Sequence, residues 1–344
     1  MAPRGAAPRG GRSSPATIAD VAEAAGVSRA TASRAINDSP QVTEETKQRV
    51  RDAVAATGFV MNARGRALAL GHSESIAILV TEPLDQFFED PTFGAILRGI
   101  SEGLAQTNTM PVLLQAWTPD EHRRALRQFQ RRAVDAVINI SPYVGEDMLE
   151  GLAECHLPVV LCGQLESQPY AGFATVYADD VVGARLAAQR IRERGRRRVA
   201  IINGPQDNPA AVDRDRGYRE VLDQCVDESL VVATHWDESS GFEAMRHLLA
   251  LAPDLDGVLA ASDRLASGAL AALSAAGRAV PEDVSVIGFD DHPIAARLSP
   301  ALTTIHQPLI DQGRIASQLA LKMVGGAPAS TIVLDMELVE RASV

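Results

Sequence analysis

Features that define several common protein classes are missing from this sequence of 344 residues. It has three cysteines, Cys155, Cys162 and Cys225, and none belongs to a C-x-x-C pair or lies near a histidine at metal-binding spacing. No apolar run reaches the roughly 18 residues that a membrane-spanning helix needs. We therefore expect buried thiols in a reducing compartment, no metal or other cofactor, and no membrane partner.

The first fifteen residues lack the apolar stretch of a signal peptide. They read MAPRGAAPRGGRSSP, and this Arg-, Pro- and Gly-rich composition is typical of a disordered tail. A protein without an export signal is expected to be cytoplasmic.

Motifs of common enzymes are also absent. The sequence contains no G-x-S-x-G, no H-E-x-x-H and no Walker phosphate loop. Paired acids occur at Asp179 and Asp180 and at Asp290 and Asp291, but adjacent carboxylates at a strand end point different ways and make a poor acid/base couple. We therefore do not expect an enzyme.

Charge is divided unevenly along the chain. The formal net charge is −11, yet residues 1–72 hold ten of the 33 basic residues and six of the 44 acidic ones, a net of +4. The remainder carries −15. A basic head can contact phosphates while an acidic body is repelled by them, so contact with nucleic acid should be confined to the head and depend strongly on salt.

Residues 17–37, TIADVAEAAGVSRATASRAIN, predict two short helices that meet at a glycine. Apolar residues recur at helical spacing in the first helix, Gly26 suits the left-handed conformation that ends a helix, and Ser28 can cap the next one. The second helix has one apolar face and an opposite face of Arg, Ser and Ala. This is the pattern of a helix-turn-helix.

A third helix is predicted over residues 42–58. We expect Thr43 to open it with a capping box, and we expect Val50, Val54 and Ala55 to lie along its packed face. This helix would complete a small core under the first two.

With these residues the chain resembles the lactose-repressor (LacI/GalR) family of bacterial transcriptional regulators. The resemblance is carried by T-I-A-D-V-A-E-A-A-G-V-S-R-A-T-A-S-R-A-I-N, by V-T-E-E-T and by G-F-V-M-N-A-R-G-R-A-L, and it continues to near the C-terminus. It implies a regulator, most simply a repressor, that binds a palindromic double-stranded DNA operator as a homodimer. A small-molecule effector, expected to be a carbohydrate, would control that binding, in either direction.

The resemblance also implies which residues contact DNA. They are Thr17, Ser28, Arg29, Ala30, Thr31, Ser33, Arg34, Asn37, Asn62, Arg66 and Leu68. Arginine can bind guanine O6 and N7 together, so Arg29 and Arg34 should set base preference. Leu68 would wedge into the minor groove from a hinge helix, in which Met61 replaces the usual Pro and Gly65 lowers the helix propensity.

From Ser75 onward, short apolar runs alternate with helical patterns. The predicted strands cover residues 76–80, 112–115, 136–140, 159–162, 199–202, 257–260 and 285–288. The helices between them include residues 93–107, 121–132, 180–194 and 264–277. Because the apolar runs are continuous, both faces of each strand should be buried, in parallel sheets covered by helices. Repeated units over about 270 residues exceed one core, so two subdomains with a ligand cleft between them are expected.

The predicted fold class is therefore α/β, with an N-terminal helix-turn-helix headpiece and a sensor that resembles the periplasmic-binding-protein fold, built of two parallel-sheet subdomains. The expected parts are a disordered tail (1–15), the headpiece (16–60), a hinge helix and linker (61–73), an N-subdomain (74–177 with 308–329) and a C-subdomain (178–307 with 330–344). By the resemblance, the chain crosses between the subdomains near Tyr177, Gln307 and Pro328.

The family's effector residues correspond to Phe93, Arg214, Trp236, Ser262, Asp290 and Gln307. Arg214 can bridge two hydroxyls or a carboxylate, Asp290 would accept paired hydroxyl hydrogen bonds, and Trp236 would stack on a sugar face. Many sugar-responsive relatives carry Asp where Gly163 stands and Asn where Ser262 stands. The pocket should therefore favour a different hydroxyl pattern, a modified sugar or a non-sugar effector.

Two other functions remain open from the sequence. A sugar-binding receptor without DNA function would share the sensor fold but would need export, against which the missing signal peptide argues. A sugar-processing enzyme would be revealed by turnover of a candidate sugar.

Overall fold

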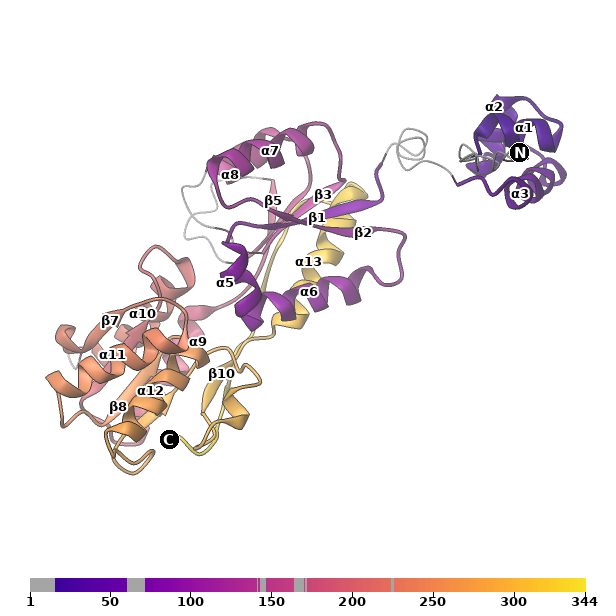
Figure 1. The fold of residues 1–344 in the computed structure, drawn as a ribbon. Coiled ribbons are helices and arrows are strands. Elements are labelled where there is room, and N and C mark those ends of the chain that lie inside the picture. The colour runs from indigo at the N-terminus through magenta and orange to yellow at the C-terminus, as the bar shows by residue number, and fades with distance from the viewer. Residues whose placement is uncertain are drawn as a thin grey trace, which may run out of the picture. The chain divides into compact units, whose positions relative to one another are not determined.

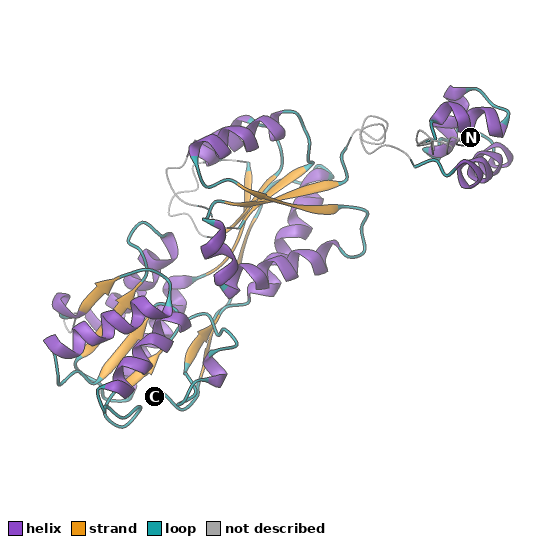
Figure 2. Cartoon of the chain, in the orientation of Figure 1, coloured by secondary structure: helices purple, strands orange, loops and turns teal. Residues whose placement is uncertain are grey.

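The computed structural model describes residues 16–60, 72–140, 142, 147–163, 170, 172–223 and 226–344. It contains two compact units, Met1–Ser73 and Glu74–Val344, which are described separately. The predicted tail, most of the predicted hinge segment with Asn62, Arg66 and Leu68, and Cys225 lie outside the described residues. Figure 1 labels the elements along the chain, and Figure 2 marks them by type.

The headpiece has the predicted helix-turn-helix, α1 (Ile18–Ala25) and α2 (Arg29–Ile36), followed by α3 (Glu44–Thr57). Gly26 ends α1 with a φ of +65°, and the Ser28 side chain caps α2 by accepting the Thr31 N–H. The three helices share a small core, whose buried members are Val21, Ala25, Ala35, Val50 and Ala53.

Two details of the headpiece differ from the sequence prediction. The capping box belongs to α1, where Asp20 at the third helical position accepts the Thr17 N–H at 2.6 Å. Thr43 caps α3 alone, because the matching position there is Thr46, which has no carboxylate. Ala55 is exposed, and Ala53, one turn from Val50, faces the core in its place.

The first half of the sensor is a six-stranded parallel sheet. Its strands in spatial order are β11 (Thr331–Leu334), β5 (Phe173–Ala178), β4 (Val159–Cys162), β3 (Ala136–Asn139), β1 (Ser75–Val80) and β2 (Met110–Gln115). Helices α6 (Pro91–Leu104) and α13 (Leu309–Val324) cover one face, and α7 (Pro119–Gln130) and α8 (Asp147–Glu154) cover the other (Figure 1). Alternate residues of β1 enter the two cores, Ile76 and Ile78 on one side and Ala77 and Leu79 on the other. A short helix, α5 (Leu84–Glu89), precedes α6.

The second half of the sensor has a four-stranded parallel sheet and a two-stranded antiparallel one. The larger sheet runs β7 (Val231–Ala233), β6 (Val199–Asn203), β8 (Gly257–Ala260) and β9 (Ser285–Ile287), and the smaller joins β10 (Thr304–His306) to β12 (Glu337–Val339). Four helices surround them in the pairs α9 (Asp180–Glu193) with α10 (Pro209–Leu222) and α11 (Glu238–Leu251) with α12 (Asp263–Ala275). Among the described helices, none is both long and apolar enough to cross a bilayer.

The chain passes between the two halves three times. The first two connections consist of Asp179, and of Gln307 with Pro308. The third consists of Asp335 and Met336, so the prediction of a crossing near Pro328 is wrong. Strand β11 stays with the first sheet because it pairs in parallel with β5, and residues 331–334 therefore belong to the N-subdomain rather than to the C-subdomain.

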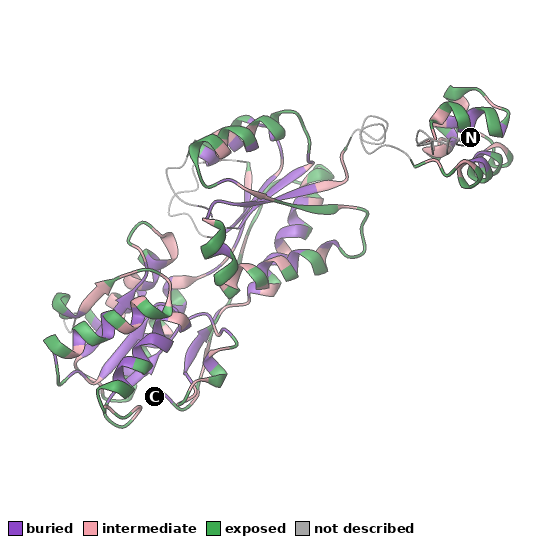
Figure 3. Ribbon diagram, viewed as in Figure 1, coloured by how far each residue is buried: buried purple, intermediate pink, exposed green. Residues whose placement is uncertain are grey.

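Each of the seven predicted strand positions forms a strand, but one of them is not buried. Most strands are buried on both faces (Figure 3), whereas β2 at the edge of its sheet exposes Met110, Val112 and Leu113. Val112 and Leu113 are adjacent and point to opposite faces, so both faces of β2 are open among the described residues. An apolar run in the sequence predicts a strand, but it does not indicate whether other elements cover the faces of that strand.

Helices α6 and α13 touch along their backbones. A Cβ added at Gly99 would lie 1.9 Å from the carbonyl oxygen of Ile310, and one at Gly313 would lie 2.1 Å from that of Ile96. Only glycine permits this approach, which fixes the two helices against each other.

Candidate functional site

The second headpiece helix presents a polar face to solvent. Arg29, Ala30 and Arg34 are exposed, while Ala32 and Ala35 on the opposite side are buried. Among the described residues, neither arginine side chain makes a hydrogen bond or an ion pair. In the described part of the chain, two guanidinium groups without a protein partner therefore lie on a helix whose opposite face packs on the headpiece core.

Four of the other predicted DNA contacts take part in helix caps. Ser28 Oγ lies 2.8 Å from Thr31 Oγ1 at the start of α2, and Asn37 Nδ2 donates to the Ser33 carbonyl at its end, at 2.9 Å. Thr17 Oγ1 donates to Asp20 at the start of α1. These side chains are fixed in place beside the exposed face, as surface groups that position a helix on a phosphate backbone need to be.

A buried lysine holds the end of α2 against α3. Lys47 Nζ lies 2.6 Å from the carboxylate of Asp38, just after α2, and 2.8 Å from that of Glu44 in α3. Its side chain is 7% exposed. The orientation of α2 is therefore fixed by an ion pair as well as by the small apolar core.

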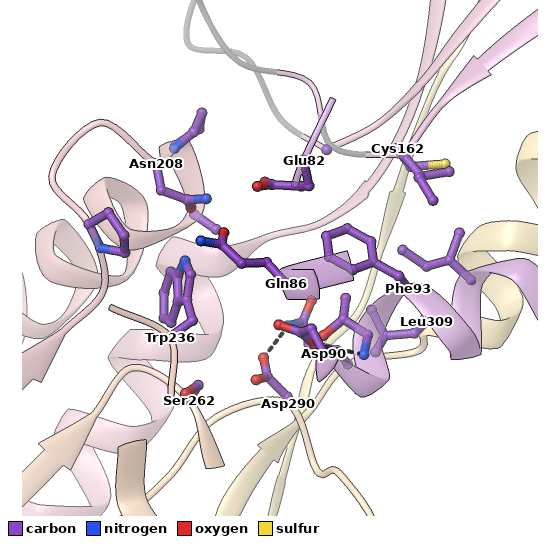
Figure 4. A pocket seen from close by; sticks show the side chains of 18 of the residues that line it. Glu82, Gln86, Asp90, Phe93, Cys162, Asn208, Trp236, Ser262, Asp290 and Leu309 are labelled. Atoms are coloured by element: carbon purple, nitrogen blue, oxygen red, sulfur yellow. Dashed lines mark hydrogen bonds between the residues drawn. The ribbon is translucent and has the colours of Figure 1, made fainter. Parts of the chain in front are cut away.

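The sensor contains a cavity of about 770 Å³ where the carboxyl ends of its two larger sheets meet. Its lining includes all six residues predicted to bind an effector: Phe93, Arg214, Trp236, Ser262, Asp290 and Gln307. Figure 4 shows several of these side chains directed into the same space from both halves of the sensor. The position agrees with the rule that parallel sheets place ligands beyond the carboxyl ends of their strands.

Arg214 lies at the buried side of this cavity, on α10. Its Nε donates to Asp180 Oδ1 at 2.7 Å, its Nη1 donates to the Ala261 carbonyl, and Nη1 lies 3.1 Å from Asp290 Oδ1. The guanidinium also stacks on Phe289, with Cζ 3.9 Å from the ring centre. The side chain is thus held in one orientation before any ligand arrives.

Asp290 follows β9 in a backbone conformation that L-residues rarely adopt, with a φ of +105°. Its N–H donates to the Ile305 carbonyl at 2.8 Å, and its side chain accepts from Gln307 Nε2 at 2.6 Å. The neighbouring Asp291 instead bonds Arg341 at 2.6 Å, so the two adjacent carboxylates do point different ways.

A second buried carboxylate, Asp263, anchors the segment that follows Asp290. Asp263, at the start of α12, accepts hydrogen bonds from the Thr304 hydroxyl and, at 2.7 Å, from the His292 N–H. The His292 ring contacts the other half of the sensor, where Nε2 lies 3.1 Å from the Thr92 hydroxyl of α6. This network joins the floor of the cavity to the opposite half of the sensor.

Burial dominates the titration of the three carboxylates. It raises the pKa of Asp180 to about 6, although Arg214 opposes the shift. Burial also raises the pKa of Asp290, against the influence of Arg214, and raises the pKa of Asp263 well above its usual range with a further contribution from Asp290. For Arg214, burial disfavours the charged guanidinium, but Asp180 and Asp290 outweigh it and raise the pKa.

Ser262 and Trp236 line the cavity in different ways. Ser262 is buried, and its hydroxyl caps α12 by accepting the Leu265 N–H at 3.2 Å. Trp236 packs its ring on Gly204, where an added Cβ would lie 2.2 Å from the ring, and its centre lies 5.7 Å from Arg214 Cζ. The indole is therefore a fixed wall beside the arginine.

Several lining residues were not predicted from the sequence. They include Glu82, Gln86, Asp90, Trp117, Asn208 and Arg264. Arg264 Nη1 lies 3.7 Å from Asp90 Oδ2, which adds a second contact between the two halves. Of these residues, only Asp90 and Asn208 carry a signal in the sequence, because each precedes a proline and caps a helix. Such caps mark the strand-to-helix loops at the carboxyl edge of a parallel sheet.

Cys155 and Cys162 are buried and unpaired, and burial raises the pKa of Cys162 to about 12. Over the described part of the chain, no three His, Cys, Asp or Glu side chains are grouped to hold a metal ion. Cys162 lines the cavity as a small apolar group.

Comparisons with known families agree with both parts of the chain. Residues 17–62 match the family described as bacterial regulatory proteins, lacI family, and residues 188–344 match the periplasmic binding protein-like domain. Among curated proteins, the HTH-type transcriptional regulator CelR of Thermobifida fusca is 36% identical over 332 residues, which covers 95% of this chain and 98% of that protein. GalR of Salmonella typhimurium is 32% identical over 335 residues, 96% of each chain.

Solved structures show the same relationship. A complex of the regulator CelR with cellobiose superposes with a TM-score of 0.75 at 35% identity, over 96% of this chain and 100% of that one. A lac repressor dimer bound to operator and the anti-inducer ONPF has a TM-score of 0.82 at 24% identity, over 96% of this chain and 99% of that one. At that identity the second comparison shows the shared fold.

Proposed function

Because this chain belongs to the LacI family of bacterial regulatory proteins, we propose that it is a sequence-specific transcriptional regulator, most simply a repressor, controlled by a sugar bound in the sensor cavity. One observation carries the proposal. A single chain combines a helix whose exposed face carries two arginines without a partner among the described residues and a separate cavity lined by every predicted effector residue. A receptor without DNA function would have no use for that helix.

The headpiece supplies DNA recognition. Arg29 and Arg34 read base edges in the major groove, because a guanidinium can donate to O6 and N7 of one guanine. Ala30 contacts a base through its methyl group, and the residues around the helix caps, Thr17, Ser28, Thr31, Ser33 and Asn37, position the headpiece on the phosphates. By the family resemblance, Asn62, Arg66 and Leu68 add contacts in the minor groove.

The sensor cavity supplies effector binding. CelR was solved with cellobiose, and a sugar suits the groups gathered in this cavity. Arg214, Asp290 and Gln307 bind its hydroxyls, Trp236 and Phe93 contact its apolar faces, and Ser262 lines the floor. Carboxylates in this cavity serve binding rather than turnover, so the protein is not an enzyme.

A homodimer is the form that reads a palindromic operator. The lac repressor structure with which this chain shares its fold is a dimer on DNA. In this chain, Met110, Val112 and Leu113 of β2 are exposed apolar side chains at a sheet edge, a surface that pairing with a second copy would cover. We place the regulator in the cytoplasm, where its operator lies.

Replacing Arg29 with alanine tests the DNA-binding half of the proposal. An operator is first selected from random duplexes with the full-length protein at moderate salt, and affinities are then measured for single-base variants by fluorescence anisotropy. Arg29→Ala is expected to lose roughly 1–3 kcal/mol of discrimination at one base pair. Arg49→Ala is the control, because it removes the same charge from the exposed surface of α3 and should weaken all duplexes about equally.

Two results would contradict the assignment. If Arg29→Ala keeps the wild-type order of affinities across all operator variants, the arginine does not read a base. If the wild-type protein selects no duplex over random competitor, with or without sugars, the chain is not a sequence-specific regulator.

A further inference from the structure

The chain has two tryptophans, and the topology gives them the same place in the two halves of the sensor. Trp117 follows β2, the edge strand beside β1, and Trp236 follows β7, the edge strand beside β6. Each stands immediately before the N-cap residue of a helix, Thr118 for α7 and Asp237 for α11. Both line the same cavity from opposite sides, one in each subdomain.

The contact that usually places an apolar residue before an N-cap does not account for either tryptophan, although Trp236 also packs against the core of the C-subdomain. An apolar residue before an N-cap commonly packs on the fourth helical residue, but that residue is His122 in α7 and Gly241 in α11. Trp236 is wedged between Gly204 and Arg214, whereas Trp117 leaves 47% of its surface exposed. A large aromatic side chain that stays open at the mouth of a cavity is suited to stack on a ligand.

The charge of the cavity restricts the ligand further. Among the described residues, nine carboxylate side chains line it against two arginines, Arg214 and Arg264. Both arginines already face carboxylates, because Arg214 contacts Asp180 and Asp290, and Arg264 lies within 3.9 Å of Glu89 and closer to Asp90. An anionic ligand would meet net repulsion, while hydroxyl groups can donate to the carboxylates.

We propose that the effector is an uncharged oligosaccharide of at least two rings, one stacked on Trp236 and another on Trp117. This inference rests on the proposed function. The first ring lies beside Arg214 and Asp290, and the second leads outward along the N-subdomain. The cavity of about 770 Å³ is in the upper part of the range found for ligand pockets, roughly 300–1,000 Å³, and leaves room for a second ring. Sugar phosphates and sugar acids are excluded by the carboxylates.

Titration calorimetry on the full-length protein tests the second ring. Cellobiose, maltose, lactose and xylobiose are compared, and the disaccharide that binds most tightly is studied with its monosaccharide. Trp117→Ala should weaken the disaccharide about tenfold and change monosaccharide affinity less than about twofold, whereas Trp117→Phe should retain most of the affinity. Phe88→Ala is the matched control, because Phe88 is a 73% exposed aromatic residue on α5 that does not line the cavity.

The charge requirement is tested with the same disaccharide in two altered forms. A uronic acid form, with a carboxylate in place of one CH₂OH, should bind at least about tenfold more weakly than the neutral sugar, and added salt should reduce the difference. An amino-sugar form tests for a cationic ligand. If the amino sugar binds more tightly than the neutral one, or if the acid binds as well, the uncharged class is wrong.

The outcomes separate this inference from the proposed function. Equal disaccharide affinity in wild type and Trp117→Ala, or binding of monosaccharides alone, overturns the two-ring effector while sugar control of the operator stands. If no sugar binds the wild-type protein or changes its operator affinity, both the inference and the proposed sugar effector fail.

Discussion

The central charged groups on the C-subdomain side of the cavity are buried and bonded to their neighbours, whereas several lining groups of the N-subdomain are exposed. Arg214 and Asp290 line the cavity and are 6% and 5% exposed, Asp263 beside them is fully buried, and all three are bonded to neighbours. Across the cavity, Glu89 and Trp117 are open to solvent. The buried residues of the C-subdomain are preorganised to bind a ligand, whereas the exposed residues of the N-subdomain can adjust to the ligand that is bound. The difference suggests that affinity is set in one half and ligand choice in the other.

The largest effect is expected when Arg214, the cation between the buried carboxylates, is removed. Arg214→Ala leaves Asp180 and Asp290 buried without their shared partner, so the free energy of unfolding should fall by about 3–5 kcal/mol at neutral pH and sugar binding should be lost. Urea unfolding followed by circular dichroism measures the first effect, and calorimetry measures the second.

The comparison supplies a control from the N-subdomain. Arg98→Ala breaks an exposed ion pair with Glu102 on α6 and should cost about 0.5 kcal/mol or less. Equal losses of stability in the two variants would mean that the buried carboxylates do not depend on Arg214, and the contrast between the subdomains would not hold.

The pH dependence of stability tests the burial of the charged groups in the C-subdomain. Burial raises the pKa of Asp180 to about 6, from 3.8 in an unfolded chain, so folding favours the protonated form. Its contribution to stability is therefore fully present below about pH 4 and is lost as the pH rises through 6. Relative to Asp180→Asn, which does not titrate, the wild type should lose about 2–3 kcal/mol of unfolding free energy over this window. Parallel curves for the two proteins between pH 4 and 6 would contradict the assignment.

The smallest effect is expected where the two halves touch. Thr92→Val removes the hydroxyl that lies 3.1 Å from His292 Nε2 in the other half of the sensor, so sugar affinity should fall about two- to tenfold without a measurable loss of stability. Thr107→Val is the control, because that hydroxyl bonds the Leu104 carbonyl at the other end of the same helix. Unchanged affinity in Thr92→Val would show that this contact does not contribute to closing the cavity.

Local patterns in the sequence were enough to locate the headpiece and most of the sheets. Gly26 and Ser28 define the turn between two helices by their own backbone and side-chain chemistry, so no distant residue is needed to predict it. The family resemblance supplied the effector residues, and the structure gathers all six around one cavity. Their roles as ligand contacts stay predictions.

Features that depend on distant pairing were missed. The third crossing was misplaced because β11 pairs with β5, more than 150 residues earlier in the chain, and nothing local to β11 indicates that partner. The exposure of β2 was missed because an apolar run does not show that it lies at an edge. Trp117 was overlooked for the same reason, since its equivalence to Trp236 is visible only once the order of the strands is known.

Asp179, Gln307 with Pro308, and Asp335 with Met336 form three short straps between the halves of the sensor. Three short connections of this kind act together as a hinge, which allows the two halves to bend toward each other but resists sliding and twisting of one half against the other. A bound sugar would then not need to reshape either half, because a small change of angle at the straps moves the far end of the N-subdomain by a much larger distance. The signal transmitted from the cavity would then be a change in the angle between the two halves of the sensor.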